Sequence, residues 1–294
     1  LKNTLVSVAI VTFNRVLEVE RALNSVYKQS YSPIEVIVLD NASCDETVLM
    51  IKEKFPKVKL IKSSLNFGCP KGRNIAAENC SGEIIYFLDD DAWIESNVLE
   101  ELVSGFIDDD LVAVMMPNIL EYYGQEKFYR YSAKNKMRLM TFSGGVSAIK
   151  RSIFKEIGPF PDTKYGAEEN YLAIKLFAKN YKIVLIPNLI AHHKPSIVRN
   201  IKEVLYLRVR NDIIWVWTFT PRLILPFLLS WKLIIWLKYG MKNNSIIPIA
   251  KALLNGIFIY GFSFGKDRFK VKYSVFIGYL LNRKKVLKVI KQHL

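Results

Sequence analysis

Short apolar runs alternate with helical patterns through the first part of the chain, and this alternation constrains the fold more than any other feature. Residues 5–12, 34–39, 58–62 and 83–88 are rich in β-branched and apolar residues and predict buried strands. Helical patterns lie between them, over residues 17–29 and 71–80, and from a capping signature at Ser43 and Glu46 to Pro56. Right-handed crossovers of this kind place strands parallel and helices on both faces of the sheet. We therefore expect an α/β protein with a mainly parallel sheet.

The second half is less regular. A helix is predicted over residues 97–107, a strand over 112–116, a further helix over 168–180, and a short strand over 183–186 that Pro187 should end.

Polar residues follow each of the first four strands. Ligands bind beyond the carboxyl ends of the strands in open parallel sheets, so these residues predict a binding site at one sheet edge, although any one group alone is typical of turns. They are Thr12-Phe13-Asn14-Arg15, Asp40-Asn41-Ala42-Ser43, Asn66-Phe67-Gly68 with Gly72-Arg73-Asn74, and Asp89-Asp90-Asp91.

The acidic triplet is the sharpest of these signals. Three adjacent carboxylates repel one another unless a cation neutralises them, and carboxylate oxygens suit Mg²⁺ or Mn²⁺ that bridges phosphates. Asp89 and Asp91 share a side-chain direction if the strand pattern continues. The alternative is a solvated acidic turn, which is our interpretation of Asp108-Asp109-Asp110 because that triplet follows a helix.

The positive charge is concentrated in the last third of the chain. Of the 42 Lys and Arg residues, 18 lie in residues 199–294 with only 3 Asp and Glu, so all of the net charge of +15 lies there. Two apolar stretches, 212–237 and 246–265, carry Lys and Arg, and Trp215, Trp217, Trp231 and Trp236 are of the type found at water–lipid boundaries. We expect helices lying on an anionic membrane surface. Spanning helices, or a helical subdomain that packs on the body or forms an oligomer, are the alternatives.

The cysteines and the N-terminal sequence indicate in which cellular compartment the protein works. Cys44, Cys69 and Cys80 show no CxxC spacing and fit a reducing compartment. The sequence shows no basic segment followed by an apolar stretch and a cleavage site, so no signal peptide is expected. The expected location is cytoplasmic, at the inner face of the cell membrane.

The ordered motifs VTFNR, LDNAS, N-x-G with GRN, FLDDDA, FSGG and GAEEN resemble those of inverting family 2 glycosyltransferases, which have the GT-A fold. The resemblance covers about residues 5–198. It implies a catalytic domain over 1–198, and the charge and apolar stretches of the remainder predict a helical membrane-associating region over 199–294. It also implies transfer of a sugar from a UDP- or dTDP-sugar to a hydroxyl of a glycan or lipid-linked acceptor, with Mn²⁺ or Mg²⁺ as cofactor. The LDNAS form favours enzymes that extend a surface polysaccharide or lipid-linked glycan.

The same resemblance implies roles for individual residues. The donor nucleotide would be bound by Thr12, Asn14, Arg15, Asp40, Ser43, Asn66, Arg73, Asp89 and Asp90, and the metal by Asp91, Asp89 and His192. Gly144 and Gly145 would let the backbone approach the sugars, and Arg210 would bind a donor or lipid-carrier diphosphate. Arg210 could equally pair with a carboxylate of the body.

The catalytic base is expected in GAEEN. The family usually has Glu-Asp at this place, whereas this chain has Glu168-Glu169, so the Asp position is occupied by Glu169. We favour Glu169 and keep Glu168 as the alternative. Both could instead be acids that face the dipole at the start of a helix.

Two other classes of protein are alternatives to a glycosyltransferase. A sugar nucleotidyltransferase would need a Gly-rich basic loop directly after the first strand, and VTFNR lacks one. A basic lipid- or nucleic-acid-binding protein would explain the charge but leave the four strand-end groups unexplained. No nucleic-acid partner is expected.

Overall fold

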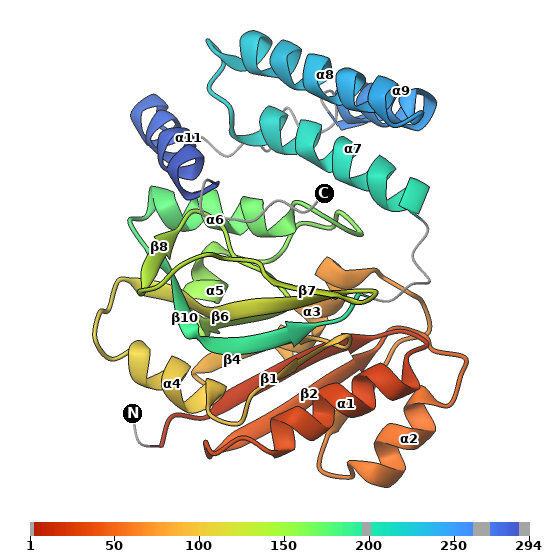
Figure 1. The fold of residues 1–294 in the computed structure, drawn as a ribbon, viewed down its shortest axis with the longest axis vertical. Helices are drawn as coiled ribbons and strands as arrows, with labels where there is room; N and C mark the ends of the chain where they lie inside the picture. The colour runs from red at the N-terminus through yellow and green to blue at the C-terminus, as the bar shows by residue number, and fades with distance from the viewer. Residues whose placement is uncertain (1–2, 196–200, 261–270, 288–294) are drawn as a thin grey trace.

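The computed structural model describes residues 3–195, 201–260 and 271–287, and it shows an α/β body with a group of helices at one end (Figure 1). Within these ranges ten strands form one sheet. In spatial order they are β3 (Lys59–Lys62), β2 (Ile34–Asp40), β1 (Val6–Thr12), β4 (Ile84–Asp89), β9 (Val146–Lys150), β6 (Val112–Tyr123), β10 (Lys182–His193) and β5 (Ala92–Ile94), with β7 (Glu126–Tyr129) beside β6 and β8 (Met137–Leu139) beside β10. The α/β fold class is confirmed.

The expected parallel arrangement is found in the first half of the sheet. Strands β3, β2, β1 and β4 run parallel, and their register places Thr12 beside Asp40 and Val11 beside Asp89. The second half is mixed, because β9 runs antiparallel to both of its neighbours while β10 runs parallel to β6. The carboxyl ends of the first four strands therefore meet at one edge, as the sequence predicts.

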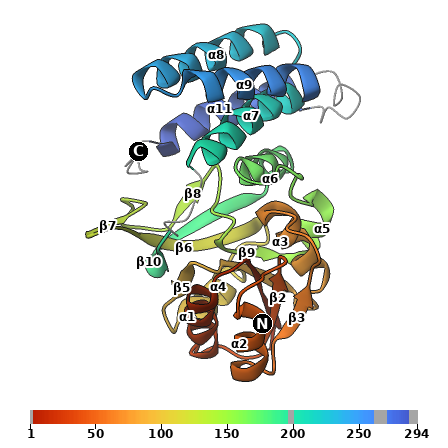
Figure 2. The same ribbon diagram turned by 90° about the vertical axis from the view of Figure 1, so that its right-hand side faces the viewer.

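Helices cover both faces of the sheet. Helices α1 (Val16–Tyr27) and α2 (Thr47–Lys54) lie on one side, and α3 (Cys69–Glu78) and α5 (Arg151–Ile157) lie on the other (Figure 2). Helix α4 (Val98–Gly105) packs against β6 and β10, and α6 (Glu168–Ala178) packs against β10. Strand residues such as Val8, Ile10 and Ile37 are fully buried, which explains why these strands are apolar on both faces.

The predicted Ser43–Glu46 cap is wrong. Helix α2 begins at Thr47, and the Ser43 hydroxyl instead accepts a hydrogen bond from the Asn14 backbone N–H. Glu46 occupies the N-cap position without a side-chain cap hydrogen bond, and Asp45 before it accepts from the Thr47 backbone N–H at 3.0 Å in an Asx-type turn.

Two strands are longer than the sequence predicts. Pro187 does not end β10, which continues to His193, and the pairing with β6 shifts in register between Ile186 and Ile190. Proline lacks a backbone N–H, and an irregular segment tolerates that loss. Strand β6 likewise continues past Met116 to Tyr123. These extensions carry Glu121 and His193 to the sheet edge.

The C-terminal region forms α7 (Ile201–Phe219), α8 (Leu225–Lys242), α9 (Ile246–Asn255), the π-helix η1 (Gly256–Tyr260) and α11 (Tyr273–Leu287). The expected apolar stretch 212–237 is divided between α7 and α8 by a turn that contains Pro221. Among the described residues, none of the helices combines the length and apolar character needed to cross a bilayer. The expected domain boundary at 198/199, and residues 261–265 of the second stretch, lie outside the described residues.

Helices α7 and α11 pack on the body. The Trp215 indole N–H donates to the Asn170 carbonyl at 3.1 Å, and the Tyr279 hydroxyl donates to the Met140 carbonyl at 3.0 Å. Asn211 is fully buried, and its amide group donates to the carbonyls of Thr163, Tyr165 and Gly166. Helices α8 and α9 lie outside α7 and are the elements farthest from the sheet (Figures 1 and 2).

Candidate active site

A cleft of about 1040 Å³ lies at the carboxyl ends of the parallel strands and extends to α7 and α8. Of the expected site residues, its lining includes Thr12, Arg15, Asn66, Arg73, Asp89, Asp90, Asp91, Gly145, Glu168 and Glu169. The far wall adds Leu207, Arg208, Asp212 and Lys232, which the sequence analysis did not select. It also includes Trp236, which the sequence analysis expected at a membrane surface but whose indole N–H donates to Asp212 in the cleft wall. The body and the C-terminal helices therefore build one cleft together.

Asp89, Asp91 and His193 form a cluster at the floor of this cleft. One ligand atom from each lies within 4.8 Å of the others. Asp91 is buried, whereas the Asp89 side chain is 31% exposed and open to the cleft. Two carboxylates and an imidazole form a donor set that fits Mn²⁺, and also Mg²⁺ with less preference for the nitrogen.

Asp90 is not part of that cluster and pairs with Arg15. The Arg15 guanidinium lies 2.6 Å from Asp90 Oδ1 and 3.0 Å from Asp91 Oδ2. Burial raises the pKa of Asp90 to about 7, against the lowering effect of the Arg15 charge. Arg15 therefore pairs with carboxylates of the triplet, whereas the sequence analysis expected it to bind the donor nucleotide.

The histidine in the cluster is His193, and the structure does not bring the expected His192 into it. Successive side chains of a strand point to opposite faces, so only one of the two can face the cleft. His192 stacks on Trp93 with ring centroids 4.9 Å apart, and its Nδ1 lies 2.8 Å from the Tyr122 hydroxyl. His193 Nε2 lies 3.3 Å from Asp91 Oδ1.

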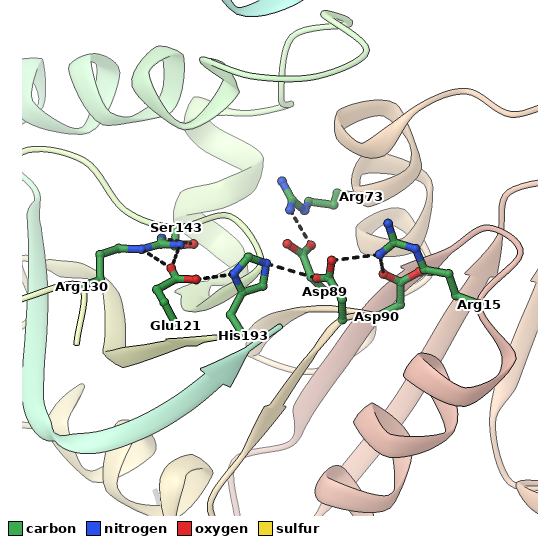
Figure 3. A network of polar contacts seen from close by, with 9 residues as sticks. Arg15, Arg73, Asp89, Asp90, Glu121, Arg130, Ser143 and His193 are labelled. Atoms are coloured by element: carbon green, nitrogen blue, oxygen red, sulfur yellow. Dashed lines mark hydrogen bonds and ion pairs between the residues drawn. The ribbon is translucent and has the colours of Figure 1, made fainter. Parts of the chain in front are cut away.

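A chain of charged groups continues beyond His193 (Figure 3). His193 Nδ1 lies 2.7 Å from Glu121 Oε2, and Arg130 donates to the other carboxylate oxygen of Glu121 and to the Ser143 hydroxyl. Burial lowers the pKa of His193, but hydrogen bonds with Asp91 and Glu121 raise it to about 9. The sequence analysis missed Glu121 and Arg130; the apolar residues Ile119 and Leu120 after Pro117 were the signal that the strand continues to Glu121.

Arg73 lies beside the carboxylates of Asp89, Glu168 and Glu169. It is buried and lies 2.6 Å from Asp89 Oδ1, 3.3 Å from Glu168 Oε1 and 4.0 Å from Glu169 Oε1. Burial, with the neighbouring Glu169 charge, raises the pKa of Glu168 to about 8. Glu169 is different, because its side chain is 23% exposed and its Oε1 accepts from the Gly144 backbone N–H at 3.1 Å.

Hydrogen bonds join the loops after β1 and β2 to each other. The Asn14 side chain accepts from the Cys44 backbone N–H at 2.8 Å, and Asp40 accepts from the Ser43 backbone N–H at 3.2 Å. The Asn41 amide donates to Asn66 Oδ1 at 3.0 Å, which links the third strand end to the second. Asn14, Asp40 and Ser43 lie beside the cleft lining rather than in it.

Gly144 and Gly145 permit close contacts within the protein itself. A Cβ on Gly145 would lie 1.9 Å from Asp89 Oδ2, and one on Gly144 would lie 2.5 Å from the Arg73 guanidinium. Their smallness is therefore needed for packing against these two side chains, whatever else approaches them.

Arg210 does not line the cleft. Its Nη2 donates to the Thr163 carbonyl at 3.0 Å and its Nε donates to Asn211 Oδ1 at 3.0 Å. It holds the loop before α6, and Arg208, two residues earlier on α7, lines the cleft instead.

Sequence comparison identifies the family. Residues 7–160, slightly more than half of the chain, match the model of glycosyl transferase family 2. The chain belongs to this family. The sequence-based prediction of a family 2 glycosyltransferase is confirmed.

Two curated relatives extend the match. The chain is 27% identical over 195 residues to the uncharacterized glycosyltransferase YwdF of Bacillus subtilis, covering 62% of this chain and 71% of the relative. It is 26% identical over 209 residues to the O-antigen chain rhamnosyltransferase RfbN of Salmonella typhimurium, covering 64% of this chain and 66% of the relative. The chain thus spans about two thirds of the length of these relatives.

Solved structures support the GT-A fold. GalNAc-T7, crystallised with UDP, GalNAc and Mn²⁺, matches with a TM-score of 0.64 at 17% identity, covering 90% of this chain and 58% of that one. The mannosyltransferase PcManGT of Pyrobaculum calidifontis, in complex with GDP-Man and Mn²⁺, matches with a TM-score of 0.60 at 18% identity, covering 98% of this chain and 81% of that one.

Gly145→Ala tests the close packing at the triplet. The new Cβ must displace Asp89 from Arg73, so we expect a loss of about 1–3 kcal/mol in the free energy of unfolding, measured by urea titration. Gly278→Ala on α11 is the control, because its Cβ would lie an ordinary 3.7 Å from Phe177. Equal stability of the two variants would contradict this account of Gly145.

Proposed function

We propose that this protein transfers a sugar from a nucleoside-diphosphate donor to a hydroxyl of a glycan or lipid-linked acceptor, with inversion at the anomeric carbon. The observation that carries the proposal is the Asp89–Asp91–His193 cluster at the floor of a cleft that also holds Glu169. Membership of family 2 supports the reaction class.

We infer that Asp89, Asp91 and His193 hold the cation. The solved structures of similar fold that contain Mn²⁺ support this assignment, and so does the donor set. A divalent cation held there would offset the negative charge that develops on the departing nucleoside diphosphate. Arg15 and Arg73 keep the surrounding carboxylates in place by pairing with Asp90, Asp91 and Asp89.

We assign Glu169 as the general base, with Glu168 as its alternative. Glu169 is open to the cleft, and the Gly144 backbone N–H orients its carboxylate. Glu168 is buried beside Arg73, and its pKa of about 8 means that it holds a proton near neutral pH. A base must reach the acceptor hydroxyl, and Glu169 meets this condition better than the buried Glu168 because its carboxylate is open to the cleft. In-line attack by that hydroxyl inverts the anomeric carbon.

The donor would lie along the loops after β1, β2 and β3. In this proposal Asp40 binds the base, Thr12, Asn14, Ser43 and Asn66 surround the nucleoside, and Arg73 lies beside the diphosphate. A UDP- or dTDP-sugar is the proposed donor, and UDP in one solved structure of similar fold supports the former.

The acceptor would enter from the end of the cleft formed by α7 and α8. Asp212 there accepts two hydrogen bonds from the Lys232 ammonium and one from the Trp236 indole N–H. An aromatic ring beside a carboxylate and an ammonium group suits a hydroxyl-rich acceptor. RfbN, an O-antigen chain rhamnosyltransferase, is a relative that supports a glycan acceptor.

We also propose that the chain works in the cytoplasm at the inner membrane face, with residues 1–198 as the catalytic domain and 199–294 as the membrane-associating region. The concentration of positive charge after residue 198 supports this location.

Asp91→Ala should abolish Mn²⁺-dependent binding of UDP while the protein stays folded. The change removes a metal ligand and also relieves repulsion within the triplet. Isothermal titration with and without Mn²⁺ measures the effect, and Asp108→Ala, in the exposed acidic triplet, is the matched control. UDP binding equal to wild type in Mn²⁺ would show that Asp91 is not a ligand.

Glu169→Gln should reduce turnover of the best sugar nucleotide in a panel by at least about a hundredfold, with little change in donor affinity. Glutamine keeps the oxygen that accepts from Gly144 but cannot take a proton. Glu168→Gln is the comparison variant. If it shows the large loss and Glu169→Gln does not, the base is Glu168.

A further inference from the structure

Helix α8 has two faces of different character. On one face, Lys232 and Trp236 contact Asp212 at the wall of the cleft. On the other, Phe227, Trp231, Ile234 and Met241 follow a helical repeat and are 76%, 56%, 52% and 60% exposed. Side chains of this size are rarely left in water on several consecutive turns of one helix.

Helix α9 continues this exposed surface. Its Ile249, Ala252 and Leu253 are buried against α7, whereas Ile246, Ile247 and Leu254 are exposed. Both helices form the outermost layer of the molecule (Figures 1 and 2). We call the exposed residues Phe227, Trp231, Ile234, Met241, Ile247 and Leu254 the outer face.

The charges around the outer face have one sign. Residues 213–260 contain no Asp or Glu but contain Arg222, Lys232, Lys238, Lys242 and Lys251. Lys232 is turned inward to Asp212, and the other four belong to exposed residues of α8, α9 and the turn before α8. Exposed apolar side chains surrounded by cations complement a bilayer with anionic headgroups.

We infer that the outer face of α8 and α9 docks on an anionic lipid surface, an inference that rests on the proposed function because it names how the enzyme meets a membrane-held acceptor. A second copy of the chain is a poorer occupant, since a two-fold contact would place the like charges of two outer faces against each other. Because α8 also supplies Lys232 and Trp236 to the cleft, docking brings the acceptor end of the cleft close to the membrane. The acceptor class that follows is a lipid-linked glycan.

Vesicles of phosphatidylcholine with an equal part of phosphatidylglycerol test the inference in co-sedimentation with the full chain. The double change Phe227→Ser with Trp231→Ser should weaken binding at least about tenfold, since each ring loses its burial in the lipid. Leu17→Ser with Leu49→Ser is the matched control, because both leucines are exposed on the body, at 77% and 54%. Wild-type binding by the α8 variant would overturn the inference.

Charge is tested separately. Lys238→Glu with Lys242→Glu should weaken binding to these vesicles, and Lys57→Glu on the body should not. Wild-type binding to vesicles of phosphatidylcholine alone should be weaker, and high salt should lower binding to the anionic vesicles.

Release only by detergent would instead indicate a spanning segment, and salt-insensitive self-association without vesicles would indicate a second copy; either result overturns the inference. If the protein turns over sugar nucleotides but does not bind vesicles, only this inference is overturned. If it binds vesicles but shows no turnover, only the proposed function is overturned.

A second inference rests on the buried carboxylate of Glu121. This side chain is 4% exposed and lies between an imidazole and a guanidinium group, with His193 Nδ1 2.7 Å from one oxygen and Arg130 Nε 2.7 Å from the other. Arg130 is itself fixed to Ser143, in the loop that packs on Asp89. With Nδ1 engaged by Glu121, the imidazole presents Nε2 to Asp91.

We propose that Glu121 is a positioning residue for His193, which orients the ring so that Nε2 faces the cation. Carboxylates that engage the second nitrogen of a metal-binding histidine fix both its orientation and its tautomer, and their loss typically lowers metal affinity about 10–100-fold.

The test is the affinity of the full chain for Mn²⁺ alone, measured by electron paramagnetic resonance. Glu121→Ala should lower the affinity about tenfold or more, and Glu121→Gln should lower it less, because its amide oxygen still accepts from Nδ1–H. Glu95→Ala is the matched control, since Glu95 lies 3.7 Å from His192 rather than from His193. Unchanged affinity in both folded Glu121 variants would overturn the inference, whereas absence of Mn²⁺ binding by the wild type would overturn the proposed metal dependence.

Discussion

The mutual repulsion of Asp89, Asp90 and Asp91 is the constraint on which the rest of this site depends. Three carboxylates at one strand end are compatible with a folded protein only if cationic groups surround them. The structure supplies Arg15 to Asp90 and Asp91, Arg73 to Asp89, and His193 to Asp91. Each comes from a different part of the chain, so neutralising the triplet also brings the first loop, α3 and β10 together.

The cationic groups around the carboxylates give each carboxylate a different environment. Asp90 is turned to Arg15 and buried, whereas Asp89 remains partly open to the cleft. Arg73 also gives two neighbouring glutamates different environments, because it lies 3.3 Å from Glu168 but 4.0 Å from Glu169. Consecutive acids therefore have different chemistry, and burial together with distance to arginine accounts for the difference.

The C-terminal helices link the cleft to the surface of the molecule. Helix α7 is fixed to the body by the Asn211 and Trp215 hydrogen bonds, and α8 is fixed to α7 by the Asp212–Lys232 ion pair. One helix can therefore supply polar residues to the cleft and apolar residues to the outer face. The sequence showed an apolar, basic region, but only the packing showed which residues point inward.

The sequence by itself determined the alternation of strands and helices, the polar strand ends and the family, because periodicity and local motifs are properties of neighbouring residues. It predicted Asp89 and Asp91 together at the sheet edge, and the structure places them in one cluster with a histidine. It did not determine which histidine, because the choice between His192 and His193 depends on how far β10 continues beyond Pro187. Nor could it find Glu121 and Arg130, or show that Arg210 holds a loop while Arg208 lines the cleft. Those outcomes depend on strand register and on contacts between residues far apart in the chain, which only the tertiary structure decided.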